Sequence, residues 1–254
     1  MKVLYSVALM VGAVALMTVG VPAFANKTDD RIESSAKKSY VFKTYLKDDD
    51  IKITSTNGAV ALTGSVDSES HRLLAQETVA AQKGVKSVDN KLVVQYASPG
   101  SPAQKDDMWL NTKVKTTLLF HKSVSAMTEV STKDGIVTLK GDASSQAEKN
   151  LTTEYAKDVD GVKGVTNDMT VTKPSNKTSE TTWGMIDDAS ITSLVKMSLL
   201  YHRSTSAIST SVTTKRGVVT LTGQAKNAAE KDLVSKLVND IKGVKSVKNR
   251  MTIS

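Results

Sequence analysis

A chain of 254 residues that is 39% hydrophobic and 24% charged has the composition of a globular protein of one to three domains. The absence of cysteine excludes disulfide scaffolds, thiolate metal sites, cysteine nucleophiles and lipidation on a cysteine. The formal net charge of +8 raises the question of an anionic partner, such as nucleic acid or a phospholipid surface.

The first 25 residues predict a secretion signal. Lys2 is their only charge, the following run to Val21 is largely apolar, and Ala23-Phe24-Ala25 has the small-x-small pattern of a cleavage site. We expect a signal peptide over 1–25 that is cleaved after Ala25. A secreted chain without cysteine suits a bacterial periplasm. The apolar run is also nearly long enough to span a bilayer, so a retained anchor stays open as the alternative.

The rest of the chain repeats one unit three times. A segment with glycine at its second and eighth positions occurs at 57–64, 134–141 and 216–223. A second segment, Gly-Val-Lys-x-Val-x-Asn, occurs at 84–90, 161–167 and 243–249. The first glycines of the two segments lie 26 residues apart in every copy, from 58 to 84, from 135 to 161 and from 217 to 243. This constant spacing predicts tandem copies of one domain.

Proline marks the boundaries between these copies. Apart from Pro22, the prolines are Pro99, Pro102 and Pro174, which lie in Ser/Thr-rich stretches between the repeats. Because proline disrupts helix interiors and central strands, we interpret these stretches as linkers. Such short linkers predict domains that stay close together but can reorient. The predicted domains are repeat 1 (28–96), a linker (97–105), repeat 2 (106–173), a linker (174–185) and repeat 3 (186–254).

Each repeat predicts the order helix, strand, strand, helix, strand. In repeat 2, Leu110, Val114 and Leu118 recur at helical spacing after the pair Asp106-Asp107, and acids favour a helix N-terminus. Repeat 3 has the same pattern after Asp187-Asp188. Second helices are expected over about 68–82, 144–159 and 226–241, followed by a strand of alternating apolar residues. We predict an α+β fold of three tandem small domains, each α-β-β-α-β with a three-stranded mixed sheet packed on two helices.

Nine of the fourteen glycines occupy repeated positions, and we predict structural roles for them. The first in each repeat lies in a hairpin turn that needs a positive φ, the second closes the following strand, and the third suits a helix C-cap. No Gly-rich phosphate-binding motif with lysine is present. The predicted structural glycines are Gly58, Gly64, Gly84, Gly135, Gly141, Gly161, Gly217, Gly223 and Gly243.

The paired acids, the Gly-x-Val-x-Leu-x-Gly strand and the Gly-Val-x-x-Val-x-Asn segment resemble the BON domain. This module occurs in osmotically inducible periplasmic proteins and in bacterial transport-associated proteins. The resemblance covers nearly all of the chain after residue 25, although three copies depart from the familiar two and the first copy is looser. It implies an α-β-β-α-β fold without known catalysis, an envelope location, and an association with osmotic stress and, in some members, with phospholipid membranes.

Nearly all of the excess positive charge lies in repeat 3. Repeat 1 is neutral, and repeat 2 is neutral when Lys105 is counted with it, whereas repeat 3 has 11 basic and 5 acidic side chains. We expect this excess to form a contact for an anionic lipid surface, and a merely solvated basic face is the alternative. The predicted lipid-binding residues are Arg216, Lys226, Lys236, Lys242, Lys245, Lys248 and Arg250.

No catalytic or metal site is predicted. His121 and His202 end the first helices of different repeats, where a histidine can face the helix dipole, and residues in separate modules are not expected to converge on one metal. His71 belongs to no ligand motif. The run Asp48-Asp49-Asp50 lacks the spacing of a calcium loop and predicts a solvated acidic turn. Because no nucleophile elbow, P-loop or HExxH motif occurs, we expect a non-enzyme without a cofactor.

The two tryptophans precede or begin first helices. For Trp109 and Trp183 we expect packing against the domain surface or a linker, and anchoring at a membrane interface is the alternative.

These features predict a non-enzymatic periplasmic protein of envelope and osmotic stress that binds membrane phospholipid. The alternative is a chaperone-like or scaffolding protein that binds other envelope proteins. Three tethered modules would bind such partners with avidity. Export and the lack of a binding motif argue against nucleic acid, and no small-molecule substrate is predicted.

Overall fold

The computed structural model describes residues 27–95, 102–172, 185–205 and 209–254. The predicted signal peptide, Trp183 and most of both predicted linkers lie outside these residues. Within the described ranges, no helix combines the length and the apolar character that crossing a bilayer requires.

Repeat 1 folds in the predicted order, but its first helix is broken. The break lies at Ser39, whose extended backbone and side-chain oxygen cap the second piece of the helix. The elements are α1 (Lys27–Lys38), α2 (Tyr40–Thr44), β1 (Asp50–Thr56), β2 (Ala59–Val66), α3 (Glu69–Ala80) and β3 (Ser87–Val94). Strand β2 is central, antiparallel to β1 and parallel to β3.

Repeats 2 and 3 have the same topology, and the predicted α+β class with three-stranded mixed sheets is confirmed. Repeat 2 consists of α4 (Pro102–Phe120), β4 (Glu129–Lys133), β5 (Ile136–Lys140), β6 (Asp142–Ala143), α5 (Gln146–Asp158), β7 (Gly164–Asn167) and β8 (Thr170–Val171). Repeat 3 consists of α6 (Asp188–Tyr201), β9 (Thr210–Lys215), β10 (Val218–Ala225), α7 (Ala228–Asn239), β11 (Ser246–Asn249) and β12 (Thr252–Ile253).

Local chemistry explains the start of each second helix and the hairpin before it. The side chains of Ser68, Ser145 and Asn227 accept the N–H groups that begin α3, α5 and α7. The hairpin turn of repeat 1 places Asn57 and Gly58 at φ of 53° and 84°, the paired left-handed residues of a tight turn.

The last strand differs between the repeats. It is continuous over eight residues in repeat 1, whereas in repeats 2 and 3 it is interrupted for two residues. The single last strand that the alternating apolar residues predict is therefore wrong in detail for repeats 2 and 3. The pairing register is the same on both sides of the interruption in repeat 3, because β10 pairs in parallel with both β11 and β12.

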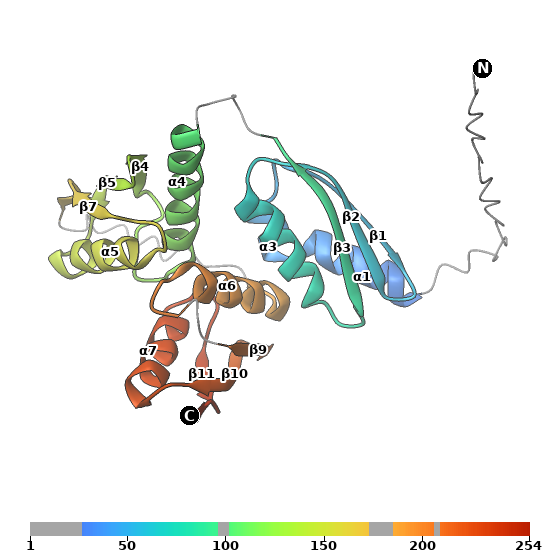
Figure 1. Cartoon of the computed structure of the whole chain (residues 1–254). Helices are drawn as coiled ribbons and strands as arrows, with labels where there is room; N and C mark the ends of the chain where they lie inside the picture. The colour runs from blue at the N-terminus through green and yellow to red at the C-terminus, as the bar shows by residue number, and fades with distance from the viewer. Residues whose placement is uncertain (1–26, 96–101, 173–184, 206–208) are drawn as a thin grey trace, which may run out of the picture.

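The three repeats pack on one another around α6 (Figure 1). Helix α3 of repeat 1 lies against α6, and one continuous apolar core joins repeats 1 and 3 and includes Phe120 of repeat 2. Repeat 2 has its own core between α4, α5 and its sheet. The expectation of domains that reorient on short linkers does not match this packing, because their buried surfaces are shared.

Candidate functional site

In each repeat, one acid of the predicted pair accepts hydrogen bonds from the hairpin turn that follows later in the same repeat. The Asp188 carboxylate accepts hydrogen bonds from the backbone N–H groups of Arg216 and Gly217, at 2.7 and 2.8 Å. Asp107 and Asp29 accept the equivalent N–H groups in repeats 2 and 1. The paired acids therefore shape the turn in addition to favouring the helix N-terminus.

The asparagine of the second repeated segment ties the last strand to the second helix. In repeat 3, Asn249 Nδ2 donates to the Lys231 carbonyl (2.9 Å) and to Ser235 Oγ (2.8 Å), and its Oδ1 accepts the Met251 N–H (2.9 Å). Asn90 and Asn167 make the corresponding contacts. Since the repeated residues hold the fold, ligand contacts are to be sought among residues that differ between repeats.

Six of the seven basic residues predicted to bind lipid are exposed, but they do not form one patch. Arg216 and Lys245 line the same cavity at the β9–β10 turn. Lys248 lies beside Thr220 on the partly exposed face of the sheet. Lys226 lies beyond the opposite end of β10, and Lys236 lies on the exposed side of α7. The last of the six is Arg250, which lies between β11 and β12.

The expectation that Lys242 belongs to an exposed basic surface is wrong. Its side chain is almost fully buried between repeats 2 and 3, where Nζ donates to the Leu119 carbonyl (2.6 Å). Its backbone N–H donates to the Phe120 carbonyl (2.9 Å). Burial lowers the pKa of Lys242 to about 8. Lys242 therefore holds repeat 2 and is not available to a lipid.

The cavity at the repeat 3 turn combines basic and apolar side chains. It has a volume of about 640 Å³, and Met185, which is 97% exposed, lies in its wall with Arg216 and Lys245. The corresponding cavity of repeat 2, about 400 Å³, has Asp134 in the place of Arg216. The repeat 3 cavity also contains Asp187 and Asp188. Their carboxylates already accept backbone and hydroxyl hydrogen bonds.

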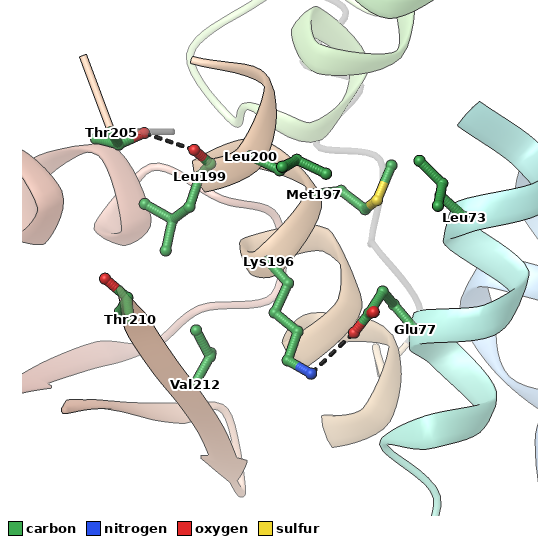
Figure 2. A pocket seen from close by; sticks show the side chains of 9 residues that line it. All are labelled: Leu73, Glu77, Lys196, Met197, Leu199, Leu200, Thr205, Thr210 and Val212. Carbon is green, nitrogen blue, oxygen red and sulfur yellow. Dashed lines mark hydrogen bonds and ion pairs between the residues drawn. The ribbon is translucent and has the colours of Figure 1, made fainter. Parts of the chain in front are cut away.

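A smaller cavity of about 260 Å³ lies between repeats 1 and 3 (Figure 2). Leu73 of α3 lies opposite Met197 on α6, and Lys196 Nζ pairs with Glu77 Oε2 at 2.8 Å across the two helices. Sequence reasoning missed this cavity, because its walls come from two repeats and carry no motif.

The structure brings together His121 and His202, two residues of separate repeats that were not expected to converge on one metal. Both rings are buried where repeats 2 and 3 meet, and their Nε2 atoms lie 3.2 Å apart. The Nδ1 atom of His121 lies 3.2 Å from Asp240, and that of His202 lies 3.0 Å from Asp158. The shared position at a helix end was visible in the sequence, but the meeting of the two helix ends was not.

Asp49 differs from the predicted solvated turn, because its side chain is fully buried. Its two oxygens contact the Asp67 N–H (2.9 Å) and His71 Nδ1 (2.7 Å) at the start of α3. Asp49, Asp67 and His71 each offer one ligand atom within 4.8 Å of the others. In repeats 2 and 3 a glutamate at the His71 position accepts the corresponding N–H. The cluster of repeat 1 is therefore explained by helix capping.

Trp109 packs as expected. Its ring is partly buried and meets the Tyr201 ring edge to face, with 6.1 Å between centroids. This contact joins α4 of repeat 2 to α6 of repeat 3, so the indole serves an interface within the chain.

Two solved structures show weak likeness to the whole chain. The C-terminal domain of CdsD, from the type III secretion system of Chlamydia trachomatis, is 17% identical, covers 89% of this chain and 96% of its own, and has a TM-score of 0.23. The PrgH periplasmic domain is 10% identical, covers 80% and 95%, and has a TM-score of 0.20.

Sequence comparison is more informative. Osmotically-inducible protein Y of Escherichia coli (strain K12) is 34% identical over 143 residues, which are 56% of this chain and 71% of that protein. An uncharacterized protein of Anaplasma centrale, from the gshII 5' region, is 32% identical over 116 residues, which are 45% and 77%. The BON domain model matches residues 28–96, 106–173 and 187–254. The chain therefore belongs to the BON domain family, with three such domains in tandem.

Proposed function

We propose that this protein is a non-enzymatic periplasmic protein of the osmotic stress response, and that repeat 3 docks it on anionic phospholipid. The relation to an osmotically inducible protein and the signal-like N-terminus support the setting. The observation that carries the lipid contact is the turn of repeat 3, where Arg216 and Lys245 flank a cavity beside the exposed Met185.

The physical basis is a two-part contact. A basic side chain close to an anionic membrane contributes about 1 kcal/mol, and this attraction decays over a Debye length of about 8 Å at physiological salt. Met185 adds an apolar side chain that can enter the interfacial region. The neighbouring Lys248 extends the positive charge along the sheet.

Vesicle flotation of the mature chain, residues 26–254, tests this contact. We expect binding to phosphatidylglycerol-containing vesicles and negligible binding to pure phosphatidylcholine. The variant Arg216→Glu/Lys245→Glu should lower the affinity about 30-fold, which corresponds to the loss of about 2 kcal/mol. The matched control Lys226→Glu/Lys236→Glu changes net charge equally at other exposed places and should change the affinity only about threefold.

Equal losses in the two variants would mean that net charge, not the turn of repeat 3, decides binding. Binding that is negligible or equal on both vesicle types would reject the lipid proposal. The alternative, a scaffold for envelope proteins, would be favoured by partners that remain bound at high salt without lipid.

The periplasmic setting has its own test. Expression of the full chain in a Gram-negative host and fractionation should place the protein in the periplasm. Its intact mass should correspond to a chain that begins at Asn26. Recovery of the uncleaved chain in the membrane fraction would favour a retained anchor.

A further inference from the structure

Repeats 2 and 3 hold each other through two copies of one contact. After its first helix each repeat carries a histidine, a basic residue and a serine, at 121–123 in repeat 2 and at 202–204 in repeat 3. The N–H of the basic residue donates to the Asp240 carbonyl in one copy (2.8 Å) and to the Asp158 carbonyl in the other (2.6 Å). The serine hydroxyls donate to the carboxylates of the same aspartates. The interface is therefore approximately two-fold symmetric.

The two histidines form the centre of this interface. Their Nε2 atoms lie 3.2 Å apart, and each Nδ1 faces the aspartate of the opposite repeat, Asp240 for His121 and Asp158 for His202. Both rings are 0% exposed. A line of carboxylate, imidazole, imidazole and carboxylate thus crosses the interface without solvent between the rings.

The number of protons on the pair decides whether these three contacts are satisfied. With one added proton, both Nδ1–H groups donate to carboxylates and one Nε2–H donates to the other Nε2. With no added proton, either two nitrogen lone pairs face each other or a lone pair faces a carboxylate. With two added protons, two N–H groups point at each other and two positive charges repel in a buried site.

We propose that His121 and His202 form a proton-dependent clamp, which closes repeats 2 and 3 while the pair shares one proton and opens them when acid adds a second. The clamp needs no lipid and does not depend on the proposed function.

The surrounding groups oppose a second added proton. Tyr155 stacks on His121, with 3.8 Å between ring centroids, and donates its hydroxyl to Asp240 (2.8 Å). Lys242 lies near His121 and opposes further positive charge there. Other charged or titratable groups at this contact include Lys113, Lys122, Asp160, Tyr201 and Arg203.

The direction of the pH effect follows from these contacts. Burial lowers the pKa of His121, the hydrogen bond with Asp240 opposes this, and the charge of His202 lowers the pKa further. In an open or unfolded chain a histidine titrates near its ordinary pKa of about 6.5. The open state therefore binds more protons below about pH 6.5, so that falling pH favours opening.

Long-range ¹H–¹⁵N NMR of the mature wild-type chain, with EDTA to exclude metals, tests the proton count without a mutation. At about pH 7 we expect Nδ1–H on both rings and one shared Nε2 proton, and at about pH 5 four protonated ring nitrogens. A pair that carries no added proton or two added protons at about pH 7, or that still shares one proton at about pH 4.5, would overturn the proposal.

A distance measurement tests the opening itself. Because the chain has no cysteine, Lys140→Cys on β5 and Asp232→Cys on α7, both exposed, can carry spin labels for pulsed electron resonance. We expect one distance at about pH 7.5 and at least a threefold rise of a longer-distance population at about pH 5.

Matched variants identify the histidines responsible. In the labelled chain, His121→Asn/His202→Asn should give distances that do not change with pH, whereas His71→Asn should keep the acid response. An acid response that persists in the double variant, or a wild-type distance that does not change, would overturn the clamp. The wild-type arm remains decisive if the double variant does not fold.

Discussion

Repeat 3 is held by its two neighbours in different ways. Its contact with repeat 2 is polar and reciprocal, and equivalent residues of the two repeats meet around the histidine pair. In its contact with repeat 1, non-equivalent elements meet: α3, the second helix of repeat 1, packs on α6, the first helix of repeat 3, in a continuous apolar core. There Thr78 donates to Ser193 Oγ (2.8 Å), and Tyr201 donates to Ser70 Oγ (3.0 Å).

The difference shows how one fold supports two kinds of interface. At the positions of the clamp histidines and aspartates, repeat 1 has Lys43 and Ala81, so it cannot form the clamp. Helix α6 instead meets repeat 1 through small residues such as Ser190 and Ser193. Helix α4 has Trp109 and the larger Thr112 at the corresponding places. Small side chains on α6 let α3 approach closely.

The largest effect should come from the apolar interface. Leu194 on α6 is fully buried in the shared core, so Leu194→Ala should destabilise repeats 1 and 3 together by about 2–5 kcal/mol. Guanidinium unfolding followed by residue-resolved NMR measures this. Leu233→Ala on α7, where the leucine is 41% exposed, is the control and should cost less than about 1 kcal/mol. Loss of repeat 3 alone would contradict a core shared by repeats 1 and 3.

The polar interface should respond next most strongly. Asp240 accepts hydrogen bonds from Ser123 and Tyr155 and faces His121, so Asp240→Ala should destabilise the contact of repeats 2 and 3 by about 1–3 kcal/mol. Chemical denaturation at about pH 7.5 measures the loss. Asp232→Ala, which removes an exposed acid on α7, the helix that ends just before Asp240, controls for charge. An equal loss of stability in the two variants would argue against a specific contact of Asp240 with repeat 2.

Strong acid should weaken the polar interface more than the apolar one. Although burial raises them, hydrogen bonds from His202 and Ser204 lower the pKa of Asp158, and those from His121 and Ser123 lower the pKa of Asp240. A lowered carboxyl pKa contributes stability above the ordinary value of about 3.8, and this is lost as pH falls through the lower, folded value. In hydrogen exchange at about pH 3, amides at the ends of α5 and α7 should therefore lose their protection before those of the α3–α6 core. Simultaneous release would contradict this order.

The smallest effect should come from the ion pair beside the apolar interface. Lys196 and Glu77 are 37% and 27% exposed, so Glu77→Gln should cost no more than about 1 kcal/mol. The cost should shrink with added salt, as thermal unfolding in low and high salt would show. A larger, salt-independent loss would mean that Glu77 supports packing.

The local fold of each repeat was predictable because its signals are short-range. Asn57-Gly58 predicts a tight hairpin, and polar residues such as Ser68 begin the second helices. The break at Ser39 was missed, since the apolar spacing continues through Tyr40. The basic surface was predicted only in part. Lys242 and Lys245 lie in the same short segment, but one is buried by repeat 2 and the other is exposed.

The sequence by itself determined three copies of one α+β module, their order of elements and the excess charge of the third, because residues close in the chain carry that information. Only the tertiary structure decided that α6 is covered by repeat 1, that Lys242 is enclosed and that His121 meets His202. Those contacts join residues about 80 or more positions apart. Their formation depends on complementary surfaces of separate modules, which no local pattern specifies.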